Sequence, residues 1–471
     1  MTQIPPTLPM RALFDAQREA SRREVDVPLA TRADRVARVR DLIEQHGNRL
    51  AEAVQADFGV RSPELTEVAD LFVLRAGLGQ LQRQLPHWMR ARRTPTPWYL
   101  WPARAQVMRQ PLGVVGVIAP WNYPVQLSLG PAATALAAGN RVMLKPSEIT
   151  PHTSALLAEL VHGAFAAEEF CVVQGGVDIA TEFSALPFDH LFFTGSTHVG
   201  RLVAQAAAAN LTPTTLELGG KSPCVIDASA DLADAATKIA HGKLLNAGQT
   251  CIAPDYVLLP RGREAEFERA YAQAVQRLFP TLVGNPDYAA IVSDRHLVRQ
   301  QALVDEARKA GARVVVLGDP PPDGQRQMPP VLVFGPSPQT RLMREEIFGP
   351  VLPVLSCDSP DEAVAHINAG SRPLALYWFG RDTAARDRVL KRTVSGGVSV
   401  NDTLMHVAHE NLPFGGVGDS GWGAYHGETG FLRFCHQKAV FTQSRLGLGH
   451  LFYPPYGDRW RRLMAWLRRW A

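Results

Sequence analysis

Short apolar runs alternate with helical segments through most of this chain, and this alternation sets the fold class. Residues 114–118 and 141–144 are runs of buried-strand type, and residues 125–138 between them have a helical pattern that ends at Gly139 and Asn140. Strand–helix pairs continue to residue 218, and the alternation starts again at residue 256 and continues to about residue 400. Such alternation predicts parallel sheets with right-handed crossovers. We therefore predict an α/β fold with two successive α/β units.

Three further segments fall outside this alternation. Residues 9 to about 92 have apolar positions at helical spacing, so we expect helices there. Residues 94–107 are punctuated by prolines and form a connector. Residues 438–445 are expected to be an extended strand that joins this connector near residue 100. A chain of 471 residues is too long for one small core, so two or three domains are expected.

Composition excludes several classes of protein. The hydrophobic fraction of 46% and the charged fraction of 20% are those of an ordinary globular protein, and no apolar run approaches the roughly 18 residues that span a bilayer. The start of the chain lacks a signal-peptide core. Five scattered cysteines predict neither a disulfide framework nor a metal site. We expect a protein of the reducing cytoplasm, with no metal.

The net charge of +4 is concentrated in one place. The last 14 residues hold five arginines and one aspartate, which accounts for the whole excess, so the body is neutral and a nucleic-acid partner is not expected. We predict that Asp458 caps a helix with tryptophan and leucine on one face and arginine on the other. Such a helix suits a membrane surface, but its apolar face could equally cover the substrate entrance or a partner subunit.

A cysteine and a glutamate carry the chemical hypothesis. Cys251 follows a glycine-containing turn, and Glu217 lies 34 residues upstream. A thiol nucleophile with a separate carboxylate base suits a reaction that passes through a thioester and then needs water. Alone, Cys251 is more often a small buried hydrophobic residue, and Glu217 an ordinary surface or ion-paired carboxylate.

Two turns at strand ends are candidates for binding a dinucleotide. Gly195, Ser196, Thr197 and Gly200 follow a strand and open a helix, where backbone can approach a pyrophosphate. Residues 145–148 place a lysine and a glutamate at another strand end, where ribose hydroxyls could be held. The alternatives are a tight strand-to-helix turn and a solvated turn.

Two further motifs supply polar groups. Asn122 follows a strand within Pro-Trp-Asn-Tyr-Pro, and its amide can donate a hydrogen bond to an oxyanion. Residues 343–350 place two carboxylates and an aromatic ring beside a turn. The alternatives here are a rigid aromatic–proline turn on the core and a charged helix end.

The order of these motifs resembles that of the aldehyde dehydrogenase superfamily, from about residue 10 to about residue 448. Residues 246–256, 412–418 and 423–427 resemble its short, class 3-like branch. The motifs are Pro-Trp-Asn-Tyr-Pro, Lys-Pro-Ser-Glu, Phe-Thr-Gly-Ser-Thr, Leu-Glu-Leu-Gly-Gly-Lys, Gly-Gln-Thr-Cys, Glu-Glu-Ile-Phe-Gly-Pro and Pro-Phe-Gly-Gly.

The resemblance implies a role for each matching residue. Cys251 is then the nucleophile, Glu217 the base for the water that cleaves the thioester, and Asn122 an oxyanion donor. The cofactor is NAD, with NADP as an option. The residues implied to bind it are Trp121, Lys145, Glu148, Gly195, Ser196, Thr197, Gly200, Leu218, Glu346 and Phe348. Tyr123, His406 and Phe414 are candidates for the substrate pocket.

The resemblance also implies a domain plan and a homodimer. Residues 1–93 and 108–216 would form a Rossmann-type NAD(P)-binding domain, and residues 217–429 the catalytic domain. Residues 94–107 and 430–448 would form a small β oligomerisation element. Residues 449–471 would be the basic tail.

The implied reaction is oxidation of an aldehyde to a carboxylic acid, on an aromatic substrate such as coniferyl aldehyde. The alternative is a long-chain fatty aldehyde, with residues 458–471 in peripheral contact with the inner face of a membrane. Two weaker hypotheses are a catalytically silent interaction protein and a redox sensor. Intact catalytic residues argue against the first, and the lack of a neighbouring resolving cysteine against the second.

Overall fold

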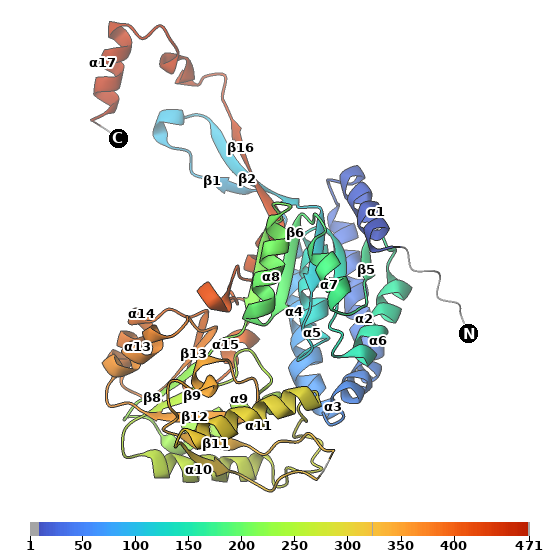
Figure 1. Cartoon of the computed structure of the whole chain (residues 1–471). Helices are drawn as coiled ribbons and strands as arrows, with labels where there is room; N and C mark the ends of the chain where they lie inside the picture. The colour runs from blue at the N-terminus through green and yellow to red at the C-terminus, as the bar shows by residue number, and fades with distance from the viewer. Residues whose placement is uncertain (1–8, 323, 470–471) are drawn as a thin grey trace.

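Two sheets of mainly parallel strands form the body of the molecule, and a small antiparallel sheet projects from it as an arm (Figure 1). The computed structural model describes residues 9–322 and 324–469. The strand order of the first sheet is β15-β7-β6-β3-β4-β5, parallel except for β15. Its strands are β3 (Val114–Ile118), β4 (Arg141–Lys145), β5 (Phe170–Val172), β6 (His190–Gly195), β7 (Thr214–Leu218) and β15 (Gly421–Trp422).

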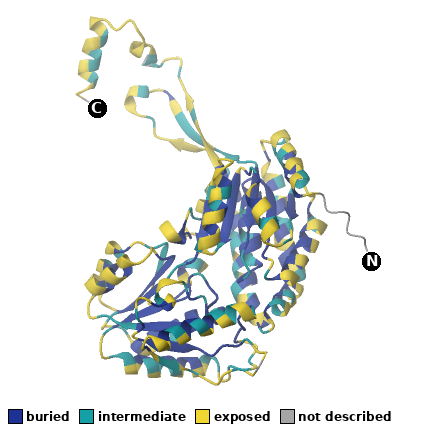
Figure 2. Cartoon of the chain, in the orientation of Figure 1, coloured by how far each residue is buried: buried dark blue, intermediate teal, exposed yellow. Residues whose placement is uncertain are grey.

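Helices cover both faces of the first sheet, which is why β3 and β4 are buried along their whole length (Figure 2). Val115 and Val117 pack with α2, α4, α5 and α6, whereas Val114 and Ile118 pack with α1, α7 and α8. This alternation follows the two-residue period of a strand. The helices are α1 (Met10–Arg23), α2 (Leu29–Phe58), α3 (Pro63–Thr66), the π-helix η1 (Glu67–Phe72), α4 (Val73–Trp88), α5 (Gln126–Ala137), α6 (Pro151–Ala164), α7 (Val177–Ser184) and α8 (Thr197–Ala208).

The second sheet has the order β10-β11-β12-β9-β8-β13-β14, and only β10 is antiparallel to its neighbour. Its strands are β8 (Pro223–Ile226), β9 (Tyr256–Leu259), β10 (Arg313–Val316), β11 (Val331–Phe334), β12 (Val351–Ser356), β13 (Ala375–Phe379) and β14 (Gly397–Val400). The helices of this half are α9 (Leu232–Leu244), η3 (Leu245–Gly248), α10 (Glu264–Leu278), α11 (Asp294–Lys309), α12 (Arg341–Arg344), α13 (Pro360–Ala369), α14 (Thr383–Arg392) and α15 (Met405–Ala408). The predicted α/β fold with two units is confirmed.

The arm is an antiparallel sheet of β1 (Arg92–Thr94), β2 (Arg104–Pro111) and β16 (Cys435–Thr442). The predicted strand over 438–445 therefore exists but begins three residues earlier, and it pairs with β2 from Cys435↔Pro111 to Thr442↔Arg104. The remaining short elements are η2 (Trp98–Leu100), η4 (Gly418–Ser420), α16 (Gly427–Arg433) and η5 (Leu448–Phe452).

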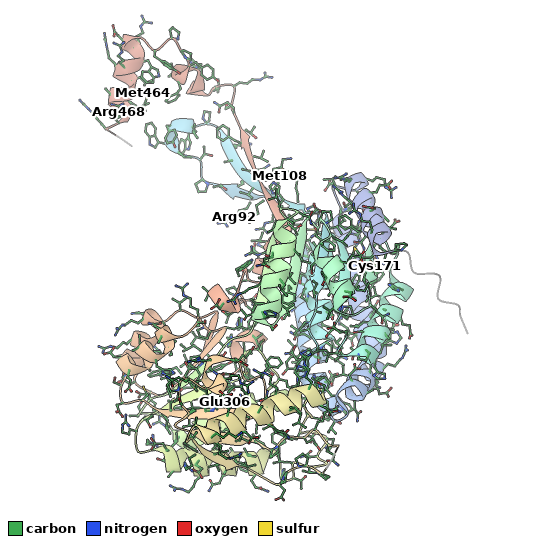
Figure 3. All side chains as sticks on the ribbon, in the orientation of Figure 1. Arg92, Met108, Cys171, Glu306, Met464 and Arg468 are labelled. Carbon is green, nitrogen blue, oxygen red and sulfur yellow. The ribbon has the colours of Figure 1, made fainter. Side chains whose placement is uncertain are left out.

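The C-terminal helix α17 (Asp458–Leu467) lies at the far end of the arm. Figure 3 shows Met464 and Arg468 there, far from Cys171 and Glu306 in the body. The prediction that Asp458 caps this helix was wrong, because Gly457 holds the N-cap position and Asp458 is the first helical residue, paired with Arg461 at 3.2 Å. Among the described residues, no helix is long and apolar enough to span a membrane.

Candidate active site

A left-handed turn delivers Cys251 to the junction of the two sheets. Asn246, Ala247 and Gly248 have φ angles of 51°, 52° and 77°, so the chain leaves α9 abruptly before reaching Cys251. A side chain at Gly248 would come within 2.3 Å of the Gly349 carbonyl oxygen, so this turn packs directly against residues 349–350. The strained backbone fixes where the thiol can lie.

Gln249 stabilises this turn through the hydrogen bonds of its side chain. Its side chain donates hydrogen bonds to the Asn246 carbonyl at 2.9 Å and the Ala290 carbonyl at 3.1 Å, and it accepts one from the Val292 N–H at 2.9 Å. Its carbonyl accepts a hydrogen bond from Nδ2 of Asn122 at 3.0 Å. The predicted oxyanion donor Asn122 is therefore bonded to a residue two positions from the predicted nucleophile.

A buried ion pair supports the same region from the N-terminal helices. Arg61 and Asp70 are fully buried and lie 2.6 Å apart. Arg61 also donates to the Asn122 carbonyl at 2.7 Å and to Oδ1 of Asn246 at 3.3 Å. The second Asp70 oxygen accepts from the Gln126 N–H at 3.0 Å, at the start of α5. Sequence analysis did not identify Arg61, Asp70 or Gln249, whose roles depend on contacts between distant segments.

The thiol and two carboxylates share a water-poor site. Burial, and then the charges of Glu346 and Glu217, raise the pKa of Cys251 to about 12. Burial also raises the pKa of Glu217 well above its usual range, and neither of its carboxylate oxygens has a hydrogen-bond partner among the described residues. Burial, and then the charge of Asp255, raise the pKa of Glu346 to about 8. Burial therefore disfavours the charged form of all three groups.

The loop that carries Glu346 is fastened by a lysine. Lys221 forms an ion pair with Asp255 and donates to the carbonyls of Leu342 at 2.9 Å and Glu345 at 3.0 Å. Gly219 allows the loop to approach, because a side chain there would come within 2.0 Å of the Glu346 carboxylate. The sequence did not predict that Lys221 and Asp255 position this loop, although Lys221 belongs to the Leu-Glu-Leu-Gly-Gly-Lys motif.

The remaining cofactor candidates gather at the carboxyl ends of the strands of the first sheet. Lys145 is buried at the end of β4 and pairs with the exposed Glu148 at 2.8 Å. Ser196 follows β6 and caps α8, with its Oγ accepting from the Val199 N–H at 3.4 Å. Thr197 begins α8, and Gly200 and Leu218 pack together, since a side chain on Gly200 would meet Leu218 at 2.6 Å.

Two aromatic residues close this side of the site. The ring of Trp121 packs edge-on against that of Phe348, with centroids 5.3 Å apart. Phe348 has a positive φ of 55°, which turns the chain back immediately after Glu346. The structure thus brings Trp121 and Phe348 together from two motifs 227 residues apart in sequence.

The three substrate-pocket candidates divide into two groups. Tyr123 lies beside the nucleophile, and its hydroxyl is 2.5 Å from Oγ1 of Thr250. His406 and Phe414 stack on each other with centroids 6.2 Å apart, and Nδ1 of His406 lies 2.9 Å from Oγ of Ser399. Burial lowers the pKa of His406 to about 4, so this histidine is neutral. Their role in binding a substrate stays a prediction.

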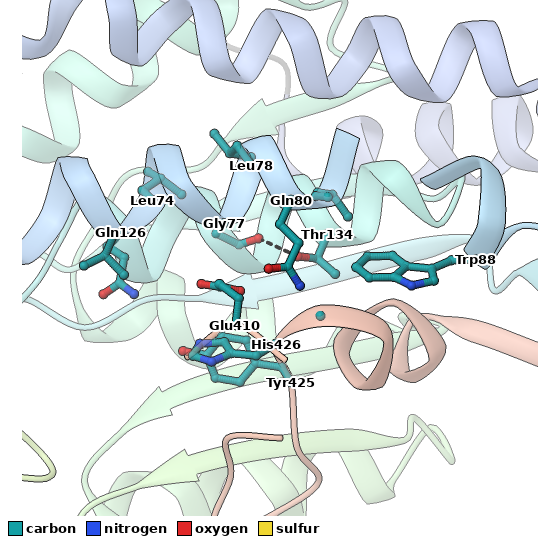
Figure 4. A pocket seen from close by; sticks show the side chains of 14 residues that line it. Leu74, Gly77, Leu78, Gln80, Trp88, Gln126, Thr134, Glu410, Tyr425 and His426 are labelled. Atoms are coloured by element: carbon teal, nitrogen blue, oxygen red, sulfur yellow. Dashed lines mark hydrogen bonds between the residues drawn. The ribbon is translucent and has the colours of Figure 1, made fainter. Parts of the chain in front are cut away.

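A cavity of about 540 Å³, which includes space open to solvent, lies beside this centre, between α4, α5 and residues 410 and 425–427 (Figure 4). Leu74, Leu78, Leu81 and Trp88 give it an apolar wall, and none of Tyr123, His406 and Phe414 lines it. Within the described part of the chain, no group of three or more His, Cys, Asp and Glu side chains is placed to hold a metal ion.

Comparisons with known proteins find similar sequences and a similar solved structure. The profile of the aldehyde dehydrogenase family matches residues 9–440. The chain is 48% identical to a probable coniferyl aldehyde dehydrogenase of Pseudomonas aeruginosa, over 97% of this chain and 95% of that protein. It is 44% identical to a coniferyl aldehyde dehydrogenase of another Pseudomonas strain, over 96% of this chain and 95% of that protein. The solved structure of the substrate-bound state of Staphylococcus aureus AldH has a TM-score of 0.93 at 34% identity, and the match covers 98% of this chain and 100% of that one.

Proposed function

This chain belongs to the aldehyde dehydrogenase family, the NAD(P)-dependent enzymes that oxidise aldehydes to carboxylic acids, and from this premise we propose that Cys251 is its nucleophile and Glu217 its base. One observation carries the assignment: the Cys251 thiol shares a buried site with two carboxylates, beside an amide anchored through Gln249. We also propose that the first sheet carries the cofactor and the second carries the nucleophile.

The first step is loss of the thiol proton to water and attack of the Cys251 thiolate on the aldehyde carbon; the C=O bond opens to an oxyanion, which becomes a thiohemiacetal on taking up a proton. Nδ2 of Asn122 and the main-chain N–H of Cys251 are the proposed donors to the resulting oxyanion. A prearranged donor of this kind contributes roughly 2.7–4 kcal/mol in the transition state. The N–H groups of Cys251 and Ile252 already lower the pKa of the thiol, although burial outweighs them.

Glu217 acts in the second half of the reaction, when the thioester must be hydrolysed. A carboxylate with a raised pKa is a stronger base once it has lost its proton, so the unpartnered Glu217 is suited to activate water. Its proton must leave first, and arrival of a water molecule in the site would favour the charged form.

The residues around the site fit a dinucleotide. Oxygen Oε1 of Glu346 is buried with no hydrogen-bond partner among the described residues, and would accept from a ribose hydroxyl. The N-terminus of α8 after β6 would take the pyrophosphate, and Lys145 with Glu148 the second ribose. When bound, the nicotinamide supplies hydride acceptance. Glu148 carries a negative charge beside the proposed ribose site, which favours NAD over NADP because a 2′-phosphate would be repelled.

We propose an aromatic aldehyde such as coniferyl aldehyde as substrate. Two relatives at 48% and 44% identity carry that substrate in their names. The apolar wall of leucines and Trp88 next to the centre suits an aromatic body.

We propose that a second copy of this chain covers the arm. Its sheet is exposed on β1 and along most of β16, and Trp98, Trp101 and Phe441 are 46%, 65% and 50% exposed. Apolar surface of this extent on a thin projecting sheet is typical of an interface.

A second candidate is oxidation of long-chain aldehydes at a membrane surface. The observation in its favour is α17, in which Trp460, Leu463, Met464 and Leu467 are partly sheltered, while the arginines are exposed. Removing residues 458–471 should then reduce co-sedimentation with anionic vesicles. Unchanged co-sedimentation would exclude a membrane role for the tail.

The deciding experiment measures NADH formation with coniferyl aldehyde, benzaldehyde, hexanal and a long-chain aldehyde, alongside Cys251→Ala. We expect the highest kcat/KM for coniferyl aldehyde and loss of activity by about 10⁴-fold or more in the variant. Preference for the long-chain aldehyde would support the second candidate, and activity retained in Cys251→Ala would refute the nucleophile.

A further inference from the structure

A single carboxylate faces the apolar cavity beside the active centre. Glu410 precedes the Pro-Phe-Gly-Gly motif and none of the reaction steps above uses it. Figure 4 shows its carboxylate directed toward α4, with Tyr425 and His426 on the opposite side. Among the described residues it has no hydrogen bond and no ion pair, and burial raises its pKa to about 7. An acceptor held in an apolar wall without a donor gains free energy from any ligand that brings one.

Two glycines open the space in front of this carboxylate. A side chain on Gly77 of α4 would come within 2.9 Å of Oε1 of Glu410. On the facing helix, a side chain on Gly130 would meet only Leu74, at 3.8 Å. Glycine inside a helix is less stable than alanine, so the space in front of Glu410 reduces the stability of both helices.

The cavity lies close to the reacting centre. Tyr123, whose hydroxyl lies beside Thr250, precedes α5, and Gln126 and Gly130 of that helix line the cavity. From the other wall, Tyr425 is near enough to Glu217, Cys251 and Glu410 for all three charges to add to burial in raising its pKa.

The polar groups of the cavity are suited to a neutral donor rather than to an anion. No lysine or arginine lines the cavity within the described chain, and burial lowers the pKa of His426 to about 4, which leaves it uncharged. Gln80 already donates to Asn411 at 2.6 Å, and Thr134 to the Gly130 carbonyl at 2.9 Å. Glu410 is the one acidic group in this lining, and Nδ1 of His426 is a second polar atom there without a partner among the described residues.

We propose that Glu410 determines substrate specificity by accepting a hydrogen bond from a hydroxyl group at the far end of an aromatic aldehyde. This inference rests on the proposed function, because it assumes that the aldehyde group lies at Cys251 and that the ring lies in the cavity. Coniferyl aldehyde itself carries such a ring hydroxyl, so the inference assigns the residue that recognises this hydroxyl and not a new substrate class. An aldehyde of the same shape without the hydroxyl leaves Glu410 without a donor.

The test compares 4-hydroxycinnamaldehyde, cinnamaldehyde and 4-methoxycinnamaldehyde on the full-length protein and on Glu410→Leu. Hydrogen bonds to a charged group contribute about 1.5–3 kcal/mol, so at a pH above the Glu410 pKa wild type should favour the hydroxylated substrate by roughly 10- to 100-fold in kcat/KM. Glu410→Leu should lose that preference and keep its kcat/KM for cinnamaldehyde, which also shows that it folds. Glu159→Gln, at a 60% exposed side chain on α6, is the matched control and should behave as wild type.

Each other outcome contradicts a defined part of the argument. A wild type that prefers the hydroxylated substrate, with the preference kept in Glu410→Leu, refutes the role of Glu410 alone. Equal loss with all three substrates in the variant shows a structural role and also refutes it, as does a wild type that does not discriminate among them. A wild type that oxidises hexanal but none of the three aromatic aldehydes refutes the proposed aromatic function itself.

Discussion

The nucleophile turn and the arm are held in place in opposite ways. Residues 246–251 are surrounded by their own chain, with Gln249, Asn122 and Arg61 bonded to one another across three segments. The arm and α17 are largely exposed, and the Trp98–Trp466 contact at 6.3 Å joins the tail to the arm rather than to the body. The proposed chemistry therefore depends on contacts within one chain, whereas the arm has much of its surface free for the second copy proposed above.

The largest expected effect comes from breaking the buried support of the turn. Asp70→Asn removes the negative charge and leaves Arg61 buried without a counter-ion, which should cost about 3–5 kcal/mol of unfolding free energy. Urea denaturation measures this, and kcat should fall as Asn122 and Asn246 lose their fixed positions. Asp234→Asn, at an exposed pair with Lys238, is the control and should change the unfolding free energy by less than about 1 kcal/mol. If both variants change the unfolding free energy by a similar amount, the buried ion pair contributes no more to stability than the exposed one.

The rate at which Cys251 is alkylated at different pH values tests the protonation state of its thiol. With a pKa of about 12, Cys251 is neutral at pH 7–9, so its alkylation by iodoacetamide should be slow and rise about tenfold per pH unit. A positive charge near the sulfur favours the thiolate, so bound NAD⁺ should lower the pKa of Cys251. Alkylation should then become roughly tenfold faster for each unit by which that pKa falls. Cys251→Ala gives the background from Cys357, the other half-buried cysteine. An alkylation rate independent of pH over this range would mean that the thiol is already ionised.

The smallest effect on catalysis and folding is expected at the arm. Phe441→Asp places a charge on an exposed strand, so unfolding of the single chain should change little while self-association is lost. Sedimentation velocity across a concentration series measures this. Phe72→Asp makes the same change at a 63% exposed site on the body and should leave association intact. If Phe441→Asp associates as wild type does, the arm is not the interface.

The sequence predicted what is local and missed what depends on distant contacts. The sequence predicted the strand and helix pattern, the N-terminal helices and the family, because each depends on residues that are close together in the chain. Arg61 looks like an ordinary surface arginine in Gly-Val-Arg-Ser-Pro, yet it is fully buried because the fold places Asp70 and Asn122 beside it. Glu410 was missed for the same reason, since its cavity is formed by α4 and α5, which lie hundreds of residues upstream.

The prediction of a helix cap at Asp458 failed for a local reason. Gly457 precedes it with extended backbone and holds the N-cap position, so Asp458 lies inside the first turn.

Strand β15 has a consequence for how the two halves can move. The chain leaves the first sheet after Glu217 on β7, builds the second sheet, and returns at β15, where Gly421 pairs with Glu217 itself. A side chain on Gly421 would lie within 1.9 Å of the Leu216 carbonyl oxygen, so only glycine fits this seam. The two halves are therefore joined by two chain crossings that both meet at the strand that carries the proposed base. A rotation of one half against the other would act directly on the position of Glu217.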